Sequence, residues 1–166
     1  MDDLAARLRD AGTALLDLRG ALVAGEPWPL SDVWGTEPEA DWGPHELLAH
    51  VDEMLPYWTA QLGAVLAGDP AVAVPFGRVA TDPARLARIE ADRQRTTADL
   101  LDGIAAGLEP AASFVAGLST ADGERRALHP IRGEMTVRGA LELFLVSHLE
   151  EHVVQMRGIL GRRRTA

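Results

Sequence analysis

The chain has 166 residues, of which 47% are hydrophobic, and it contains no cysteine. These values are typical of one globular domain over residues 1–166, and they exclude disulfides, zinc fingers and a cysteine nucleophile. The net charge of -9 and the pI near 4.9 argue against a nucleic-acid partner, because phosphate contacts need a basic surface.

No apolar run approaches the roughly 18 residues needed to cross a bilayer, so no membrane contact is expected. The opening sequence MDDLAARLRD carries acids where a signal peptide has a basic segment, and no hydrophobic segment follows it. We therefore expect a cytoplasmic protein. Any bound metal must be held by His, Asp, Glu or water.

The first predicted helix covers residues 2–23. Its apolar side chains alternate at spacings of four and three residues, which is typical of a bundle helix. These residues are Leu4, Leu8, Ala11, Leu15, Leu18 and Leu22. A glycine and two prolines end the helix, and a loop follows. The loop contains Trp28, Trp34 and Trp42, which we expect to cover one end of the core.

The second predicted helix begins at Pro44, directly after Gly43, and ends at Gly68. One face of it is apolar, and Pro56 lies in the middle, which predicts a kink. The apolar face consists of Leu47, Val51, Met54, Leu55, Trp58, Leu62 and Val65.

Two more long helices are predicted, over residues 82–108 and 136–160, with a short helix over 110–118 between them. Thr136 is expected to cap the last helix and Gly161 to end it. No convincing strand is predicted. Four amphipathic helices with long connecting loops indicate an all-α fold, a four-helix bundle.

Two histidines lie on the core side of the last helix, in the stretch SHLEEHVVQM. Counted at about 100° per residue from Leu141, His148 and His152 fall within roughly 60° of it. They are one turn apart, so both rings can reach the same point. In the second helix His50 lies at the edge of the apolar face. Three neutral imidazoles would make a site for a divalent metal, and Gln155 would orient a ligand or bond across the bundle.

Other interpretations of the same stretch remain open. Both histidines are expected to be hydrogen-bonded core residues if no metal binds. HLEEH also matches the inverted zinc-protease signature H-x-x-E-H, with Glu151 as general base. That match is weak, because such enzymes take a third ligand from a later segment and only 14 residues follow His152.

Polar residues elsewhere on the predicted helices also require an explanation. His45 is expected to be exposed, and His129 is expected in a turn or at the rim of the site. Arg93 and Thr97 interrupt the apolar face of the third helix. Either they line a polar pocket near the metal, or Arg93 pairs with Glu90 at the edge of that face.

Two segments resemble a known family. DWGPHELLAHVDEMLPYWTAQL resembles the second-helix motif of the DinB-like (DinB/YfiT) superfamily, and GEMTVRGALELFLVSHLEEHVVQMRGIL resembles its last helix, with a Thr-capped start followed by H-x-x-x-H. The resemblance implies an up-down-down-up four-helix bundle whose metal, often zinc or nickel, is held by His50, His148 and His152. It also implies a homodimer.

The resemblance further implies a function. Several members of the family are S-transferases or isomerases that use mycothiol or bacillithiol, and the Ala-, Arg- and Gly-rich, lysine-free composition favours mycothiol. We therefore expect a metal-dependent thiol S-transferase that acts on a small molecule. The alternatives are a small metal-dependent hydrolase and a non-catalytic dimeric binding module.

Overall fold

The computed structural model describes residues 1–32 and 39–165. They are mostly helical and include one small sheet, so the helical fold class is confirmed in its main part. Trp34 lies outside the described residues. Trp28 and Trp42 are buried, at 8% and 3% exposure, within the cluster of apolar side chains that forms the core. No helix among the described residues has the length and apolarity needed to cross a membrane.

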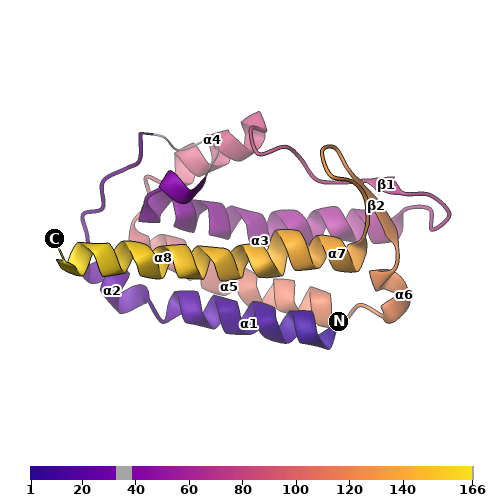
Figure 1. Cartoon of the computed structure of the whole chain (residues 1–166), viewed down its shortest axis with the longest axis horizontal. Coiled ribbons are helices and arrows are strands. Elements are labelled where there is room, and N and C mark those ends of the chain that lie inside the picture. The colour runs from indigo at the N-terminus through magenta and orange to yellow at the C-terminus, as the bar shows by residue number, and fades with distance from the viewer. Residues whose placement is uncertain (33–38, 166) are drawn as a thin grey trace.

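Long helices lie side by side along the molecule (Figure 1). They are α1 (Asp2–Leu16), α3 (Pro44–Ala67), α5 (Thr97–Ala116) and the run from α7 (Val137–Leu141) to α8 (Ser147–Thr165). α1 packs against α5 and α8, and α3 packs against the same two helices. The leucines predicted for the first helix and the apolar face predicted for the second are buried in this arrangement, apart from Leu18, which is partly exposed.

The first predicted helix is divided in the structure. α1 ends at Leu16, and α2 (Arg19–Ala24) follows after a tight turn in which the Leu18 amide donates to the Leu15 carbonyl at 3.1 Å. Gly20, a poor helix former, lies just after the turn. The predicted bounds of the second helix are confirmed, because α3 begins at Pro44, ends before Gly68 and continues through Pro56.

The third predicted helix is also divided, into α4 (Pro83–Asp92) and α5. The break lies before Thr96, whose hydroxyl accepts from the Asp99 amide and caps α5. Beyond the break α5 continues through Pro110, so the separate short helix predicted over 110–118 is wrong. α4 lies outside the long helices and packs on α3 (Figure 1).

A small sheet corrects the prediction that the chain has no strand. β1 (Val74–Pro75) pairs in parallel with β2 (Arg126–His129), which pairs antiparallel with β3 (Gly133–Thr136). Two to four residues are too few to show an alternating pattern above the noise of a loop. α6 (Thr120–Gly123) precedes the hairpin, and η1 (Glu39–Asp41) precedes α3.

The last helix begins as predicted, because the Thr136 hydroxyl accepts from the Gly139 amide at 3.0 Å. It does not end at Gly161 but continues to Thr165. In this last turn the guanidinium of Arg163 lies 4.1 Å over the Trp28 ring, which holds the helix end against the core. Between α7 and α8 the helix contains η2 (Glu142–Val146), a π-helical segment.

Candidate metal centre

The three predicted ligand histidines meet in the structure. His50 comes from α3, and His148 and His152 come from α8. The Nε2 atom of His148 lies 2.9 Å from Nε2 of His50 and 3.0 Å from Nε2 of His152. Each of the three ring pairs meets edge to face. The structure therefore brings together the three residues that the sequence singled out.

The π-helical segment η2 determines how α8 presents its two histidines. Counted at about 100° per residue, the buried face of α8 is rotated from that of α7 by roughly 100°, the angle that one extra residue adds. The buried residues are Val137, Ala140 and Leu141 in α7, and Leu149, His152, Val153, Met156 and Leu160 in α8. His152 is buried on this face and His148 lies at its edge, with side-chain exposures of 4% and 27%.

Hydrogen bonds fix the orientation of the His152 ring. Its Nδ1 lies 3.2 Å from the amide oxygen of Gln155, which can only accept, so Nδ1 carries the proton and Nε2 keeps its lone pair. The Gln155 amide nitrogen donates to the Glu39 carbonyl at 2.8 Å. Gln155 thus bonds both a candidate ligand and η1. The Nδ1 atom of His50, by contrast, is buried without a hydrogen-bond partner among the described residues.

Glu39 is a fourth member of the cluster that the sequence did not indicate. Its Oε2 lies 3.5 Å from Nε2 of His148, 3.7 Å from that of His152 and 3.9 Å from that of His50. Its other oxygen pairs with Arg85 of α4. Glu39 lies in a short helix after a Pro- and Trp-rich loop. No periodic pattern there could have singled it out.

Burial keeps the three rings neutral. Desolvation, aided by the neighbouring imidazoles and Arg85, holds the pKa of His50 well below its usual value. The same causes lower the pKa of His148 to about 3, and desolvation lowers that of His152 to about 4. Neutral imidazole is the form that binds metals, so the cluster is ready to bind without first releasing protons at neutral pH.

The donor set fits a divalent metal. Metal-to-nitrogen bonds of about 2.0–2.1 Å require about 3.3 Å between the nitrogens of a tetrahedral site and about 2.9 Å between adjacent nitrogens of an octahedral one. The two close Nε2 pairs, at 2.9 and 3.0 Å, lie at the octahedral value. Glu39, His50, His148 and His152 each offer a ligand atom, and these atoms all lie within 4.8 Å of one another.

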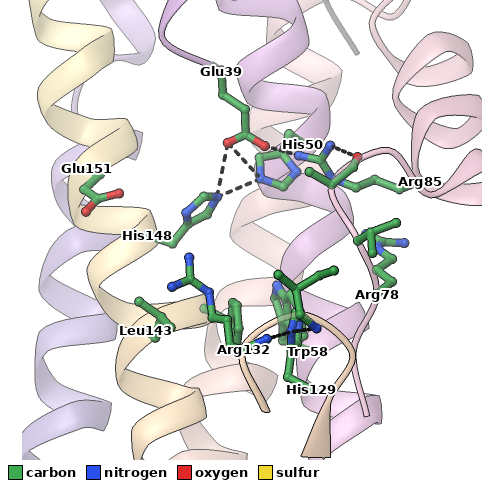
Figure 2. Close-up of a pocket in the computed structure, with 14 residues that line it drawn as sticks. Glu39, His50, Trp58, Arg78, Arg85, His129, Arg132, Leu143, His148 and Glu151 are labelled. Carbon is green, nitrogen blue, oxygen red and sulfur yellow. Dashed lines mark hydrogen bonds and ion pairs between the residues drawn. The ribbon is translucent and has the colours of Figure 1, made fainter. Parts of the chain in front are cut away.

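A pocket of about 410 Å³ opens beside the cluster. Figure 2 shows Glu39, His50 and His148 at one end of it, with Trp58, His129 and Arg132 toward the other end. The pocket therefore gives a small molecule access to the cluster.

The remaining predicted residues are divided between this pocket and other parts of the fold. His45 is not exposed as predicted: its Nδ1 lies 2.9 Å from the Arg93 carbonyl and its Nε2 lies 3.2 Å from the Thr97 hydroxyl, away from the cluster. Arg93 pairs with Glu90 at 2.9 Å, as the second interpretation of that stretch expected. His129 lines the pocket at 5% exposure.

Glu151, the general base of the zinc-protease interpretation, lies on the pocket lining and is itself exposed. It comes from the same helix as His148 and His152. That signature would require a third ligand from a later segment. The third histidine of the cluster comes instead from the earlier helix α3.

No protein-family model matches the chain, and neither the curated proteins nor the solved structures contain a significant match. The DinB-like resemblance therefore stays a prediction from the two segments that carry it.

Proposed function

We propose that this chain is a DinB-like metalloprotein whose divalent metal, zinc or nickel, is bound by His50, His148 and His152, with Glu39 beside them. The convergence of three neutral imidazole nitrogens, two of them on buried rings, carries this proposal. Carboxylate oxygen and imidazole nitrogen together suit zinc and nickel better than magnesium or calcium, which prefer all-oxygen sites.

The arrangement of the helices supports the same assignment. In Figure 1, α1 and the α7–α8 run point in one direction, and α3 and α5 point in the other. This order corresponds to the up-down-down-up four-helix bundle that the resemblance implies. The homodimer belongs to the proposal as well, and sedimentation of the purified chain at twice its mass of 17.8 kDa would support it.

The proposed reaction is the transfer of a low-molecular-weight thiol, such as mycothiol or bacillithiol, to an electrophilic small molecule. A bound divalent metal supplies positive charge that lowers the pKa of a coordinated thiol. The chain's own residues provide the rest. His148 stands at the open edge of the cluster, the pocket receives the electrophile, and the thiol proton leaves through the rim, where Glu151 lies. The sulfur forms a bond to carbon as the leaving group departs with its electron pair.

A second candidate function is hydrolysis of a small substrate. The observation that favours it is the Glu39 carboxylate, whose Oε2 lies within 3.9 Å of all three histidine nitrogens. A carboxylate at that distance can accept a proton from water, which is the role of a general base.

The experiment that tests these functions uses zinc- and nickel-loaded protein with two chromogenic substrates. Thiol transfer from mycothiol or bacillithiol to 1-chloro-2,4-dinitrobenzene reports the first function, and hydrolysis of p-nitrophenyl acetate reports the second. We expect thiol transfer that falls at least a hundredfold in His148→Ala and persists in His45→Gln, because His45 lies outside the cluster. Ester hydrolysis without thiol transfer would favour the hydrolase. Neither activity, in protein that binds no metal, would favour the non-catalytic module.

A further inference from the structure

We propose that the pocket selects small organic acids, binding their carboxylate at Arg132 and their flat apolar body against the aromatic wall formed by Trp58, Phe144 and His129. This inference rests on the proposed function, because it names the class of substrate that the metal site would act on.

Arg132 is the guanidinium available to a ligand. Three arginines line the pocket, and two of them are occupied: Arg78 bonds both oxygens of Glu53 at 2.5 Å, and Arg85 pairs with Glu39. Arg132 forms no ion pair with a carboxylate within the described part of the chain. Its guanidinium lies 5.7 Å from the centre of the Phe144 ring. Figure 2 shows it directed from the β2–β3 turn toward the side of the pocket where His148 lies.

The turn that carries Arg132 is held in place. The Nδ1 atom of His129 accepts from the backbone amides of Ile131 and Arg132, both at 3.2 Å. Burial lowers the pKa of His129, which keeps Nδ1 an acceptor at neutral pH. These two hydrogen bonds fix the backbone of the turn. A salt bridge from Arg132 to a ligand therefore costs less ordering entropy than one from a loose loop.

The wall beside Arg132 is aromatic, and Phe144 is more exposed than the buried Trp58 and His129 behind it. The Phe144 ring stacks on Trp58 at 4.5 Å with 15° between the planes, and on His129 at 4.8 Å with 21°. Aromatic faces favour planar apolar groups, which gain stacking and leave water. Phe144 comes from the π-helical segment η2, a kind of distortion that frequently marks functional sites.

The distribution of charge in the pocket favours an anion at Arg132. Arg78 and Arg85 are neutralised by Glu53 and Glu39, so Arg132 is the guanidinium that remains, and a divalent cation at the cluster adds to the positive side. Glu151, exposed at the rim, is the group that opposes an anion. A carboxylate accepts two parallel bonds from a guanidinium, and such pairs are roughly twice as strong as neutral hydrogen bonds. A neutral ligand of the same shape cannot form them.

The test compares benzoate with benzamide, which have the same ring and nearly the same shape but differ in charge. Their affinities are measured by NMR titration at one ionic strength, for zinc-free and zinc-loaded protein. We expect benzoate to bind about tenfold more tightly than benzamide in both forms, which corresponds to about 1.4 kcal/mol. In Arg132→Gln this preference should disappear in the zinc-free protein, where no metal can bind the carboxylate. In Arg157→Gln, which removes an exposed arginine outside the pocket lining, it should persist.

Three outcomes decide the inference. Equal affinity for the two ligands, or a preference that survives Arg132→Gln in zinc-free protein, would overturn it. Acetate, which has the charge without the ring, should bind at least tenfold more weakly than benzoate, and equal binding would overturn the aromatic part. Zinc binding is measured on the same samples. Its absence would contradict the proposed function, whereas a failed benzoate comparison on zinc-binding protein would contradict this inference alone.

Discussion

Among single residues, Arg85 has the largest expected influence on the cluster without belonging to it. It pairs with Glu39, donates to the Ala80 carbonyl at 2.8 Å and lies 5.2 Å over the Trp42 ring. These contacts hold the Glu39 carboxylate over the histidines. Residues that hydrogen-bond a metal ligand, and so orient it, usually lower metal affinity by 10- to 100-fold when they are lost.

We therefore expect Arg85→Gln to lower zinc affinity by about tenfold or more, measured by competition with a chromophoric chelator. The matched control is Arg88→Gln, one turn further along α4, which loses the pair with Asp92 and leaves Glu39 untouched. Unchanged zinc affinity in Arg85→Gln, or an equal loss in Arg88→Gln, would show that Arg85 does not orient Glu39.

The buried histidines also predict how acid affects the metal-free protein. The unfolded chain takes up protons on histidine as pH falls through about 6.5. The folded chain does not, because the pKa is lowered to about 3 for His148 and about 4 for His152. The free energy of unfolding should be highest above about pH 6.5. Below that it should fall by about 1.4 kcal/mol per pH unit for each such histidine.

Urea denaturation of metal-free protein between about pH 7.5 and pH 5 measures this slope before most carboxylates titrate. His148→Gln should reduce the slope by about one proton. A stability that is flat across this range would contradict the neutral, buried state of the rings, and so would an unchanged slope in the variant.

At the scale of elements, η2 is the feature that shapes the site most. A π-helical segment is equivalent to one residue inserted into an α-helix. Deleting Leu143 should therefore convert η2 into regular helix and leave the buried faces of α7 and α8 in their present directions. Deleting Val154 from regular helix, where the side chain is 69% exposed, should instead rotate Met156 and Leu160 out of the core.

We expect the Leu143 deletion to lower the melting temperature less than the Val154 deletion and to retain zinc binding. Circular-dichroism melts and zinc titrations of both variants measure this. A larger drop in melting temperature for the Leu143 deletion than for the Val154 deletion would contradict this account. It would show that η2 is not equivalent to one residue inserted into a regular helix.

Several elements were predictable from the sequence because their signals are local. Proline after Gly43 and a threonine cap at Thr136 fix where helices begin, and periodic leucines fix which faces are buried. The missed features depend on contacts between distant segments. Glu39 reaches the cluster through Arg85, 46 residues later in the chain, and the sheet joins β1 to a hairpin formed more than 50 residues later.

The faces of the last helix show the same limit. Counted from Leu141 at a regular 100° per residue, Ile159 falls on the core side of the helix, whereas Leu149 and Val153 fall outside it. The structure buries Leu149 and Val153 and leaves Ile159 partly exposed, because η2 shifts the register. His148 and His152 were still identified, because they lie in or beside the part of the helix surface where the predicted and the observed buried faces overlap.

At the scale of the whole molecule, the cluster connects segments far apart in sequence. η1, α3 and α8 each contribute, and His50 and His148 are 98 residues apart. A metal that binds only the folded chain therefore stabilises the whole arrangement. At a free concentration of about 100 times its dissociation constant it adds about 2.7 kcal/mol.

For a chain of this size we expect zinc at that concentration to raise the melting temperature by about 5–11 °C. His45→Gln should show the same rise, and His148→Ala should show none. A rise of equal size in His148→Ala would mean that zinc stabilises the protein from some other site.

The central claim is that three histidines from two helices bind one metal. The most direct measurement is the metal content, by mass spectrometry, of protein purified without a histidine tag, incubated with zinc or nickel and desalted. The account predicts about one metal per chain, reduced at least tenfold in His50→Ala and in His148→Ala and unchanged in His45→Gln. No metal in the wild-type protein, or full metal content in His50→Ala, would contradict it.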